Sequence, residues 1–172
     1  PATASVVHAN LTLPASCPCF HLSNACSGFA HAMLVAANML ELGQINAALV
    51  VAGEDGGPLV EATTQRLNED TSIGRKNSKL SFASRTIARG AAAMILTREG
   101  DHPLLGGRML VDSTANHLCQ GGVAEGFTGP LMQTDSETLM HEGVKLATQV
   151  WAETRAELGW CNADVQRVFT HQ

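Results

Sequence analysis

The chain has 172 residues, of which 45% are hydrophobic, 16% charged and 4% aromatic, as is typical of a globular chain with a sizeable core. Its formal net charge is −5 and it has no basic run, so we expect no nucleic-acid partner. Its longest apolar stretches are too short to cross a bilayer, so we expect no membrane span.

The five cysteines are odd in number and lack the spacing of a disulfide framework. This pattern predicts reduced thiols in a cytoplasmic protein. The segment Cys17-Pro18-Cys19 brings two thiols close together, but no second pair of ligands accompanies it. We therefore predict no metal site.

Two short elements and a turn begin the chain. Residues 1–11 predict a helix with proline in its first turn, which Pro14 ends. Residues 19–22 predict a short strand. This strand leads into the turn Asn24-Ala25-Cys26.

Residues 27–42 are apolar or small on nearly every face, which predicts a helix buried on most sides. Ser23 or Asn24 can cap its start, and Gly43 suits a left-handed residue just beyond its end. Cys26 falls in or just before the first turn of this helix.

The position of Cys26 allows two interpretations. Free backbone N–H groups and the positive end of the helix dipole favour thiolate over thiol, which makes Cys26 a candidate nucleophile. The alternative is that Cys26 fills the core as a small hydrophobe, as most free cysteines do.

The middle of the chain predicts further strands and helices. Residues 47–52 predict a strand buried on both faces, and the glycine-rich residues 53–57 predict a loop at its end, where α/β proteins place function. Residues 58–67 predict a helix, and residues 68–79 predict a mobile polar loop. A second buried strand is predicted at residues 89–96.

A third strand is predicted at residues 106–112, followed by a long loop over residues 113–130 that is functional or disordered. The segment Thr134-Asp135-Ser136-Glu137 matches a capping box, and the amphipathic helix behind it should run to about Leu158 before Gly159 ends it. Strands that alternate with helices in this way predict an α/β fold.

Residues 165–170 predict a last buried strand, with His171 at its carboxyl end, where catalytic side chains collect in open α/β sheets. A thiol nucleophile and its histidine partner are commonly far apart in sequence, so Cys26 and His171 are candidates to meet. Spacing alone leaves their contact open. Because the chain starts at Pro1 and stops after a predicted buried strand, we expect it to be a piece of a longer protein.

Several segments resemble the thiolase superfamily in its ketoacyl-ACP synthase III branch, and most closely the head-to-head acyl-CoA condensing thiolases of bacterial olefin biosynthesis. The branch is indicated by Ser23-Asn24-Ala25-Cys26-Ser27-Gly28-Phe29, Ala47 to Val51 with Gly53-Glu54, and Thr170-His171-Gln172. The closer similarity is seen in Pro1-Ala2-Thr3-Ala4-Ser5, Asn24-Ala25-Cys26, Met39-Leu40-Glu41 and Asn116-His117-Leu118-Cys119.

The resemblance implies a layered αβαβα thiolase-like fold, of which this chain would be an incomplete central portion. Residues 1–104 would be the latter part of the N-terminal half, with the nucleophile helix. Residues 105–172 would start the C-terminal half and stop at the catalytic histidine.

The resemblance also implies a Claisen condensation of two acyl thioesters to a β-keto product, without a cofactor, by a homodimer that takes acyl-CoA or acyl carrier protein thioesters. Cys26 would be acylated, and His171 would polarise a carbonyl or enolate. The family's glutamate base would precede Pro1 and its asparagine would follow Gln172, so we expect these 172 residues alone not to condense acyl thioesters.

Three alternatives stay open: a ketoacyl-ACP synthase III of fatty-acid initiation, a cysteine acyltransferase or hydrolase, and a catalytically silent homologue. One departure from the family concerns its Gly-x-Gly-Ala turn, where this chain has Ala88-Arg89-Gly90-Ala91. Because alanine does not readily adopt positive φ, we expect an altered turn there, with an arginine near the acyl site.

Overall fold

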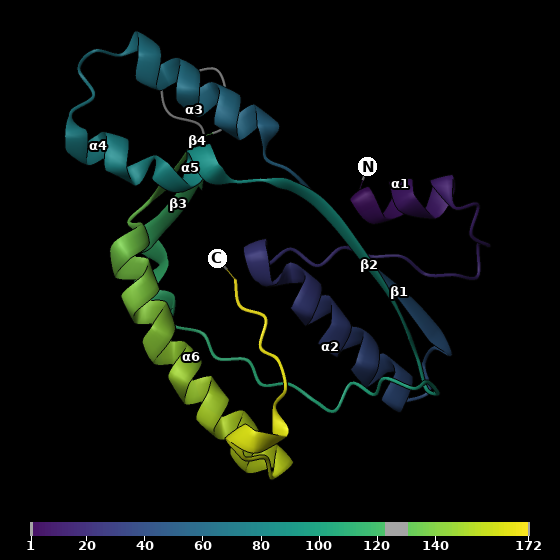
Figure 1. The fold of residues 1–172 in the computed structure, drawn as a ribbon. Helices are drawn as coiled ribbons and strands as arrows, with labels where there is room; N and C mark the ends of the chain where they lie inside the picture. Colours follow the sequence, from purple (N-terminus) through teal and green to yellow (C-terminus); the bar gives the residue numbers. More distant parts are fainter. Residues whose placement is uncertain (1, 123–130, 172) are drawn as a thin grey trace. The chain divides into compact units, whose positions relative to one another are not determined.

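The computed structural model describes residues 2–122 and 131–171 (Figure 1). The chain folds into two compact units, and each unit is built from two separate stretches of sequence. Unit 1 comprises the described residues of Pro1–Glu54 and Gly90–Leu104, and unit 2 comprises those of Asp55–Arg89 and Leu105–Gln172. The predicted division into thiolase halves at residue 104 stays a prediction.

Unit 1 holds the candidate nucleophile. Its elements are α1 (Thr3–Asn10), the 3-10 turn η1 (Ala25–Ser27), α2 (Gly28–Glu41), and most of β1 (Ala47–Asp55) and β2 (Arg89–Thr97). The two strands form a two-stranded sheet. Ala36, Leu40 and Val50 are its buried apolar side chains among the described residues.

Unit 2 contains the longest helix. Its elements are α3 (Gly57–Glu69), α4 (Arg75–Leu80), α5 (Phe82–Thr86), η2 (Ser113–Leu118), β3 (Cys119–Gly122), β4 (Leu131–Thr134), α6 (Ser136–Leu158) and η3 (Asn162–Asp164). Strands β3 and β4 are antiparallel, with Cys119 opposite Thr134. The fully buried Ser84 of α5 donates a hydrogen bond to the carbonyl of Met132 at 2.6 Å, which ties α5 to β4.

Six of the predicted elements are confirmed. The helices predicted at residues 1–11, 27–42 and 58–67 correspond to α1, α2 and α3, and the helix that ends at Leu158 is α6. The strands predicted at residues 47–52 and 89–96 are β1 and β2. The mixture of helices and strands agrees with the predicted α/β class.

Three predicted strands are wrong. Residues 19–22, 106–112 and 165–170 form no strand. A strand requires a hydrogen-bonded neighbour, and the two sheets of the described chain contain only β1 with β2 and β3 with β4. The composition of these three segments suits a strand. Among the described residues, however, no strand pairs with any of them.

The predicted loops also need correction. β1 continues to Asp55, so residues 53–57 are not a loop. Helix α4 begins at Arg75, inside residues 68–79, where arginine and lysine favour a helix despite the polar composition, and residues 68 and 69 belong to α3. Of the long loop predicted at residues 113–130, the first part forms η2 and β3, and residues 123–130 lie outside the described residues.

Burial is lower than predicted for the central elements. In α2 only Ala36 and Leu40 are buried, and in β1 only Val50 is buried. Ile95 of β2 is 71% exposed. No residue of β2 is buried, so neither face of this sheet is fully covered within the described residues. The prediction of fully buried strands and a helix buried on most sides is therefore wrong.

The N-terminus of α6 is capped by Asp135, not by Thr134 as the predicted capping box implies. The Asp135 carboxylate accepts a hydrogen bond from the backbone N–H of Thr138 at 3.2 Å, and this bond lowers the pKa of Asp135. Thr134 is buried as the last residue of β4, so it cannot serve as the cap. As predicted, Gly159 ends the helix, with a φ of +67°.

Two glycines of α6 offer a matched test of backbone conformation. We expect Gly159→Ala to destabilise unit 2 by about 1 kcal/mol, because alanine is strained at positive φ. Gly143→Ala should have the opposite effect, about 0.5–1 kcal/mol of stabilisation, since Gly143 is exposed inside the helix and an added Cβ meets no atom within 4 Å. Thermal unfolding of both variants checks the two signs, and equal shifts in one direction would contradict this account.

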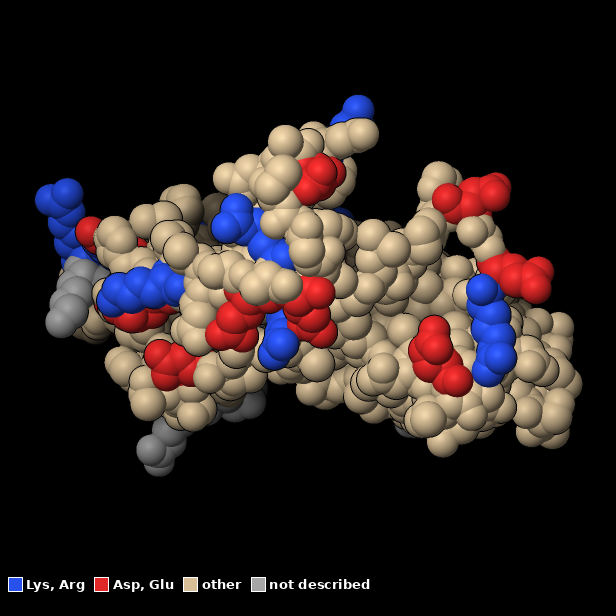
Figure 2. Space-filling model, turned by 90° about the horizontal axis from the view of Figure 1, so that it is seen from below, with Lys and Arg blue, Asp and Glu red and all other residues tan. Residues whose placement is uncertain are grey.

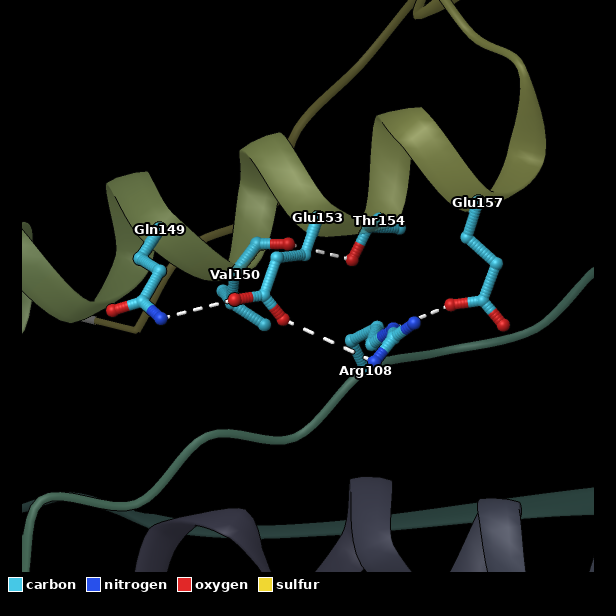
Figure 3. Close-up of polar contacts among 6 residues, drawn as sticks. All are labelled: Arg108, Gln149, Val150, Glu153, Thr154 and Glu157. Carbon is cyan, nitrogen blue, oxygen red and sulfur yellow. Dashed lines mark hydrogen bonds and ion pairs between the residues drawn. The ribbon is translucent and has the colours of Figure 1, made fainter.

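The segment before η2 is held on α6 by Arg108. The Arg108 guanidinium lies between Glu153 and Glu157, with nitrogen–oxygen distances of 3.9 and 2.5 Å (Figure 3). The amide of Gln149 donates to Glu153 at 2.9 Å and extends this group along the helix. Exposed ion pairs contribute little to stability individually, but this network fixes an extended segment that has no strand partner.

The face in Figure 2 shows basic and acidic side chains interspersed, without one large patch of either sign. Elsewhere in the described chain, Lys79 and Glu137 form an ion pair with a nitrogen–oxygen distance of 2.7 Å. Within the described residues, no helix is long and apolar enough to cross a membrane.

Candidate functional site

Cys26 lies in the middle of η1, immediately before α2 begins at Gly28. Its side chain is exposed. The predicted position in or just before the first helical turn is therefore confirmed, and core filling is not the role of this thiol within unit 1. The backbone N–H groups of Ser27 and Gly28, which follow Cys26, donate to the carbonyls of Asn24 and Ala25 within the turn.

The turn that presents Cys26 contains an uncommon backbone conformation. Ala25 has a φ of +40°, in the left-handed region that glycine adopts more easily. A residue with a Cβ costs about 1–2 kcal/mol in this region. The backbone N–H of Ser27 donates to the carbonyl of Asn24 at 3.0 Å and closes the turn around Cys26. Strain of this kind persists only where surrounding contacts hold it.

The predicted capping of α2 by Ser23 or Asn24 is wrong. Ser27 is the N-cap residue, and no side-chain cap bond is present at either Ser27 or Asn24. The reason is that η1 is inserted between Asn24 and α2 and moves the start of the helix further along the chain.

A histidine that the sequence did not single out holds this turn from inside α2. His31 Nδ1 lies 2.7 Å from the carbonyl oxygen of Ser27. The side-chain nitrogen of Asn24 lies 3.2 Å from Nε2 and 3.3 Å from Nδ1 of the same ring. The i to i+4 spacing of Ser27 and His31 was the available signal, because these positions are neighbours on a helix surface.

The other end of α2 is fixed by contacts of Leu40. The Leu40 carbonyl accepts from the backbone N–H of Gly43 at 3.0 Å and from the guanidinium of Arg98 at 2.5 Å. Gly43 has a φ of +69°, which confirms the predicted left-handed end of this helix. A cation at this end also interacts favourably with the helix dipole.

A cavity of about 350 Å³ lies beside the nucleophile turn within unit 1. Ala25 and Gly28, the residues that flank Cys26 and Ser27, contribute to its wall. The rest of the wall includes residues 47–53 of β1 and one face of α2, formed by Phe29, Ala32, Ala36 and Met39. Most of these side chains are apolar.

Arg89, in unit 2, is the second residue of the segment Ala88-Arg89-Gly90-Ala91, which stands where the family has a Gly-x-Gly-Ala turn. Its Nε donates to the carboxylate of Asp55 at 2.6 Å, and that carboxylate also accepts from the N–H of Gly57 at 3.0 Å. The bond from Gly57, with the Arg89 guanidinium beside it, holds the pKa of Asp55 below its ordinary value. Ala88 is not among the residues with positive φ, and Arg89, Gly90 and Ala91 begin strand β2, so the expected altered turn is absent here. The expected position of the arginine near the acyl site stays a prediction.

His171 is exposed and follows residues that form no strand. The side chain of Phe169 two residues earlier is 90% exposed. Cys26 belongs to unit 1 and His171 to unit 2. Their meeting at one site therefore stays a prediction.

Within residues 2–122 and 131–171, no group of three or more His, Cys, Asp or Glu side chains could hold a metal ion. All five cysteines are free. The chemistry available at the described turn is therefore that of an exposed thiol, backbone N–H groups and the Asn24 and His31 side chains.

Comparison with known proteins places this turn within a matched region. The family model of 3-oxoacyl-[acyl-carrier-protein (ACP)] synthase III matches residues 20–112. This range includes Cys26, α2, β1 and β2. It therefore covers more than half of the chain.

Two similar curated proteins are named acyl-CoA:acyl-CoA alkyltransferase. The protein from Xanthomonas campestris pv. campestris is 34% identical over 176 residues, and the protein from Shewanella oneidensis is 35% identical over 183 residues. Each match includes the whole of this chain and 50% or 52% of the relative. The chain thus spans about half the length of these relatives.

Solved structures give the same result for the fold. A cysteine-to-serine variant of OleA from Xanthomonas campestris, crystallised with bound lauric acid and lauroyl-CoA, matches with a TM-score of 0.85 and 33% identity. The match covers 97% of this chain and 49% of that chain.

Proposed function

Because the chain belongs to the 3-oxoacyl-[acyl-carrier-protein] synthase III family, we propose that Cys26 accepts an acyl group from a thioester in a condensing acyltransferase. The fold matches that of OleA, so the predicted thiolase-like fold class is confirmed. The activity, the substrates and the partners of the whole protein remain part of the proposal, because the chain spans half of its relatives.

The observation that carries the proposal is the exposed thiol of Cys26 at the N-terminus of α2. A nucleophile must be accessible, and a thiol must ionise to act as one. The positive end of the helix dipole at this position can stabilise the oxyanion that forms when a carbonyl is attacked. A buried thiol elsewhere in the fold would have neither advantage.

The proposed reaction has two stages. In the first, the Cys26 thiolate attacks the carbonyl carbon of an acyl thioester, a carbon–sulfur bond forms, and the thiol of the donor leaves. In the second, a base, which the family resemblance places before Pro1, takes a proton from the α-carbon of another acyl thioester, and the resulting carbanion attacks the carbonyl carbon of the acyl group on Cys26. A carbon–carbon bond forms, the thiolate of Cys26 leaves, and the product is a β-keto thioester.

We propose acyl-CoA as the substrate class. The support comes from the relatives named acyl-CoA:acyl-CoA alkyltransferase, at 34% and 35% identity. The second candidate is an acyl carrier protein thioester. This candidate is favoured by the family description and by a 30% identical β-ketoacyl-[acyl-carrier-protein] synthase III from Rhizorhabdus wittichii.

The remaining parts of the proposal concern His171 and the setting of the enzyme. His171 would donate to the oxygen of the second carbonyl, a role that rests on the resemblance of Thr170-His171-Gln172 to the family motif. A homodimer is proposed on the same resemblance. A cytoplasmic location is supported by the five free cysteines, which suit a reducing compartment.

Labelling tests the assignment of Cys26. We expect Cys26 to be the first cysteine alkylated by iodoacetamide and the one acylated by lauroyl-CoA in the full-length protein, because its thiol is exposed at the start of α2. Intact mass followed by peptide mapping identifies the labelled cysteine. Preferential labelling of Cys17, Cys119 or Cys161 would contradict the assignment.

Product analysis separates the alternative functions. A β-keto product from lauroyl-CoA indicates condensation, whereas free lauric acid alone indicates a hydrolase. A protein that acylates Cys26 and releases neither product would be a transferase without condensation. One that is never acylated would be a catalytically silent homologue.

A further inference from the structure

The geometry points to His31 as a positioning residue that holds the Cys26 turn in its reactive conformation, an inference that rests on the proposed nucleophilic role of Cys26. His31 lies on the second turn of α2, and its ring contacts residues on both sides of Cys26 in the sequence. These residues are Asn24 and Ser27. The imidazole thus bridges the turn from Asn24 to Ser27.

The hydrogen-bond partners determine which ring nitrogen carries the proton. A carbonyl oxygen can only accept, so the 2.7 Å contact with the carbonyl of Ser27 requires a proton on Nδ1 of His31. In the neutral ring Nε2 is then an acceptor. The amide nitrogen of Asn24, 3.2 Å away, donates to it. The remaining contact, 3.3 Å between the same Asn24 nitrogen and Nδ1, would join two donors and is no hydrogen bond in this tautomer.

The turn needs such a bridge for two reasons. Ala25 is held at a φ of +40°, which is unfavourable for a residue with a Cβ. In addition, no side chain caps either η1 or α2, so the usual contact that fixes the start of a helix is missing. The His31 ring links the residue before Ala25 to the residue after Cys26, and so restrains the backbone at both ends of the strained segment.

This restraint matters for acyl transfer because the thiolate must meet a thioester carbonyl at a defined position. A displacement of about 1 Å in a reacting group can reduce the rate by about 100-fold. We therefore expect removal of both ring contacts to slow the acylation of Cys26 more than it lowers the stability of the protein.

The test measures the rate at which lauroyl-CoA acylates Cys26 in the full-length protein, together with the thermal midpoint. His31→Phe keeps the ring but removes both nitrogens, and should slow acylation by about 10- to 100-fold. His31→Asn places an amide nitrogen as many bonds from Cα as Nδ1, so its N–H can donate to Ser27 and should restore most of the rate. His102→Phe, at an exposed histidine, is the control and should leave the rate unchanged.

A second variant covers the case in which His31→Phe does not fold. Asn24→Ala removes only the contact to Nε2, and it should also slow acylation. In the double variant the two losses should not add, because both residues act through one bridge. Wild-type rates in His31→Phe or in Asn24→Ala would overturn the role of His31, as would an equal loss in His31→Asn and His31→Phe. Absence of Cys26 acylation in the unmodified protein would instead overturn the proposed function, and the inference with it.

Discussion

Replacing Cys26 by alanine in the full-length protein should abolish both acylation and condensation, with a loss in rate on the order of 10⁴ or more. Losses of this size follow when the covalent nucleophile of an enzyme is removed, because the remaining groups only bind and orient the substrate. The measurement is product formation from lauroyl-CoA by mass spectrometry. Because the Cys26 side chain is exposed, the thermal midpoint should change little.

Cys161→Ser is the matched control for this substitution. Cys161 is also a free, exposed cysteine, but it lies in unit 2 at the start of η3. Its replacement should leave the rate of product formation unchanged, since serine can keep the polar contact at the start of the turn. Full activity in Cys26→Ala, or an equal loss in Cys161→Ser, would refute the assignment of the nucleophile.

The second large effect is expected at His171. His171→Ala in the full-length protein should slow condensation by about 10²–10³, the usual loss when one donor to an oxyanion is removed. Acylation of Cys26 by the first substrate should continue, because the proposed role of His171 concerns the second carbonyl. Burst kinetics of CoA release, measured alongside the β-keto product, separate the two stages.

The control for this histidine is His102→Ala, at an exposed loop position. It should leave both stages unchanged. If His171→Ala condensed at the rate of the unmodified protein, His171 would have no place in the mechanism. If it blocked acylation and condensation equally, its role would lie in the first stage.

The helices were predictable because local sequence determines much of their character. A continuous run of apolar and small residues predicted α2, and apolar residues at helical spacing predicted α6. Gly43 and Gly159 predicted their ends, since a left-handed residue there suits glycine. The strands were harder to predict. Residues 165–170 have a suitable composition for a strand, but whether they form one depends on a neighbour that may be anywhere in the sequence.

At the site, the part that could not be predicted depends on backbone conformation and not on distant residues. The position of Cys26 next to a helix start could be predicted, because that helix is defined by its own sequence. The bridge made by His31 could not, since it depends on the inserted turn η1 and on the left-handed backbone of Ala25. Nothing in the residue types alone shows that an alanine adopts that conformation.

The contact between Arg98 and Leu40 has a consequence for the order of folding during synthesis. The guanidinium that binds the end of α2 follows β2, and the ribosome makes residues 55–89 of unit 2 before it reaches Arg98. The ribosome adds about 5–20 residues per second, so several seconds pass between the synthesis of α2 and that of Arg98. During this interval residues 90–104, which complete unit 1, have not yet been made, and the apolar face of α2 stays exposed. Slower translation of residues 55–97 would prolong this exposure. It would also prolong the time during which the nascent chain needs protection by a chaperone.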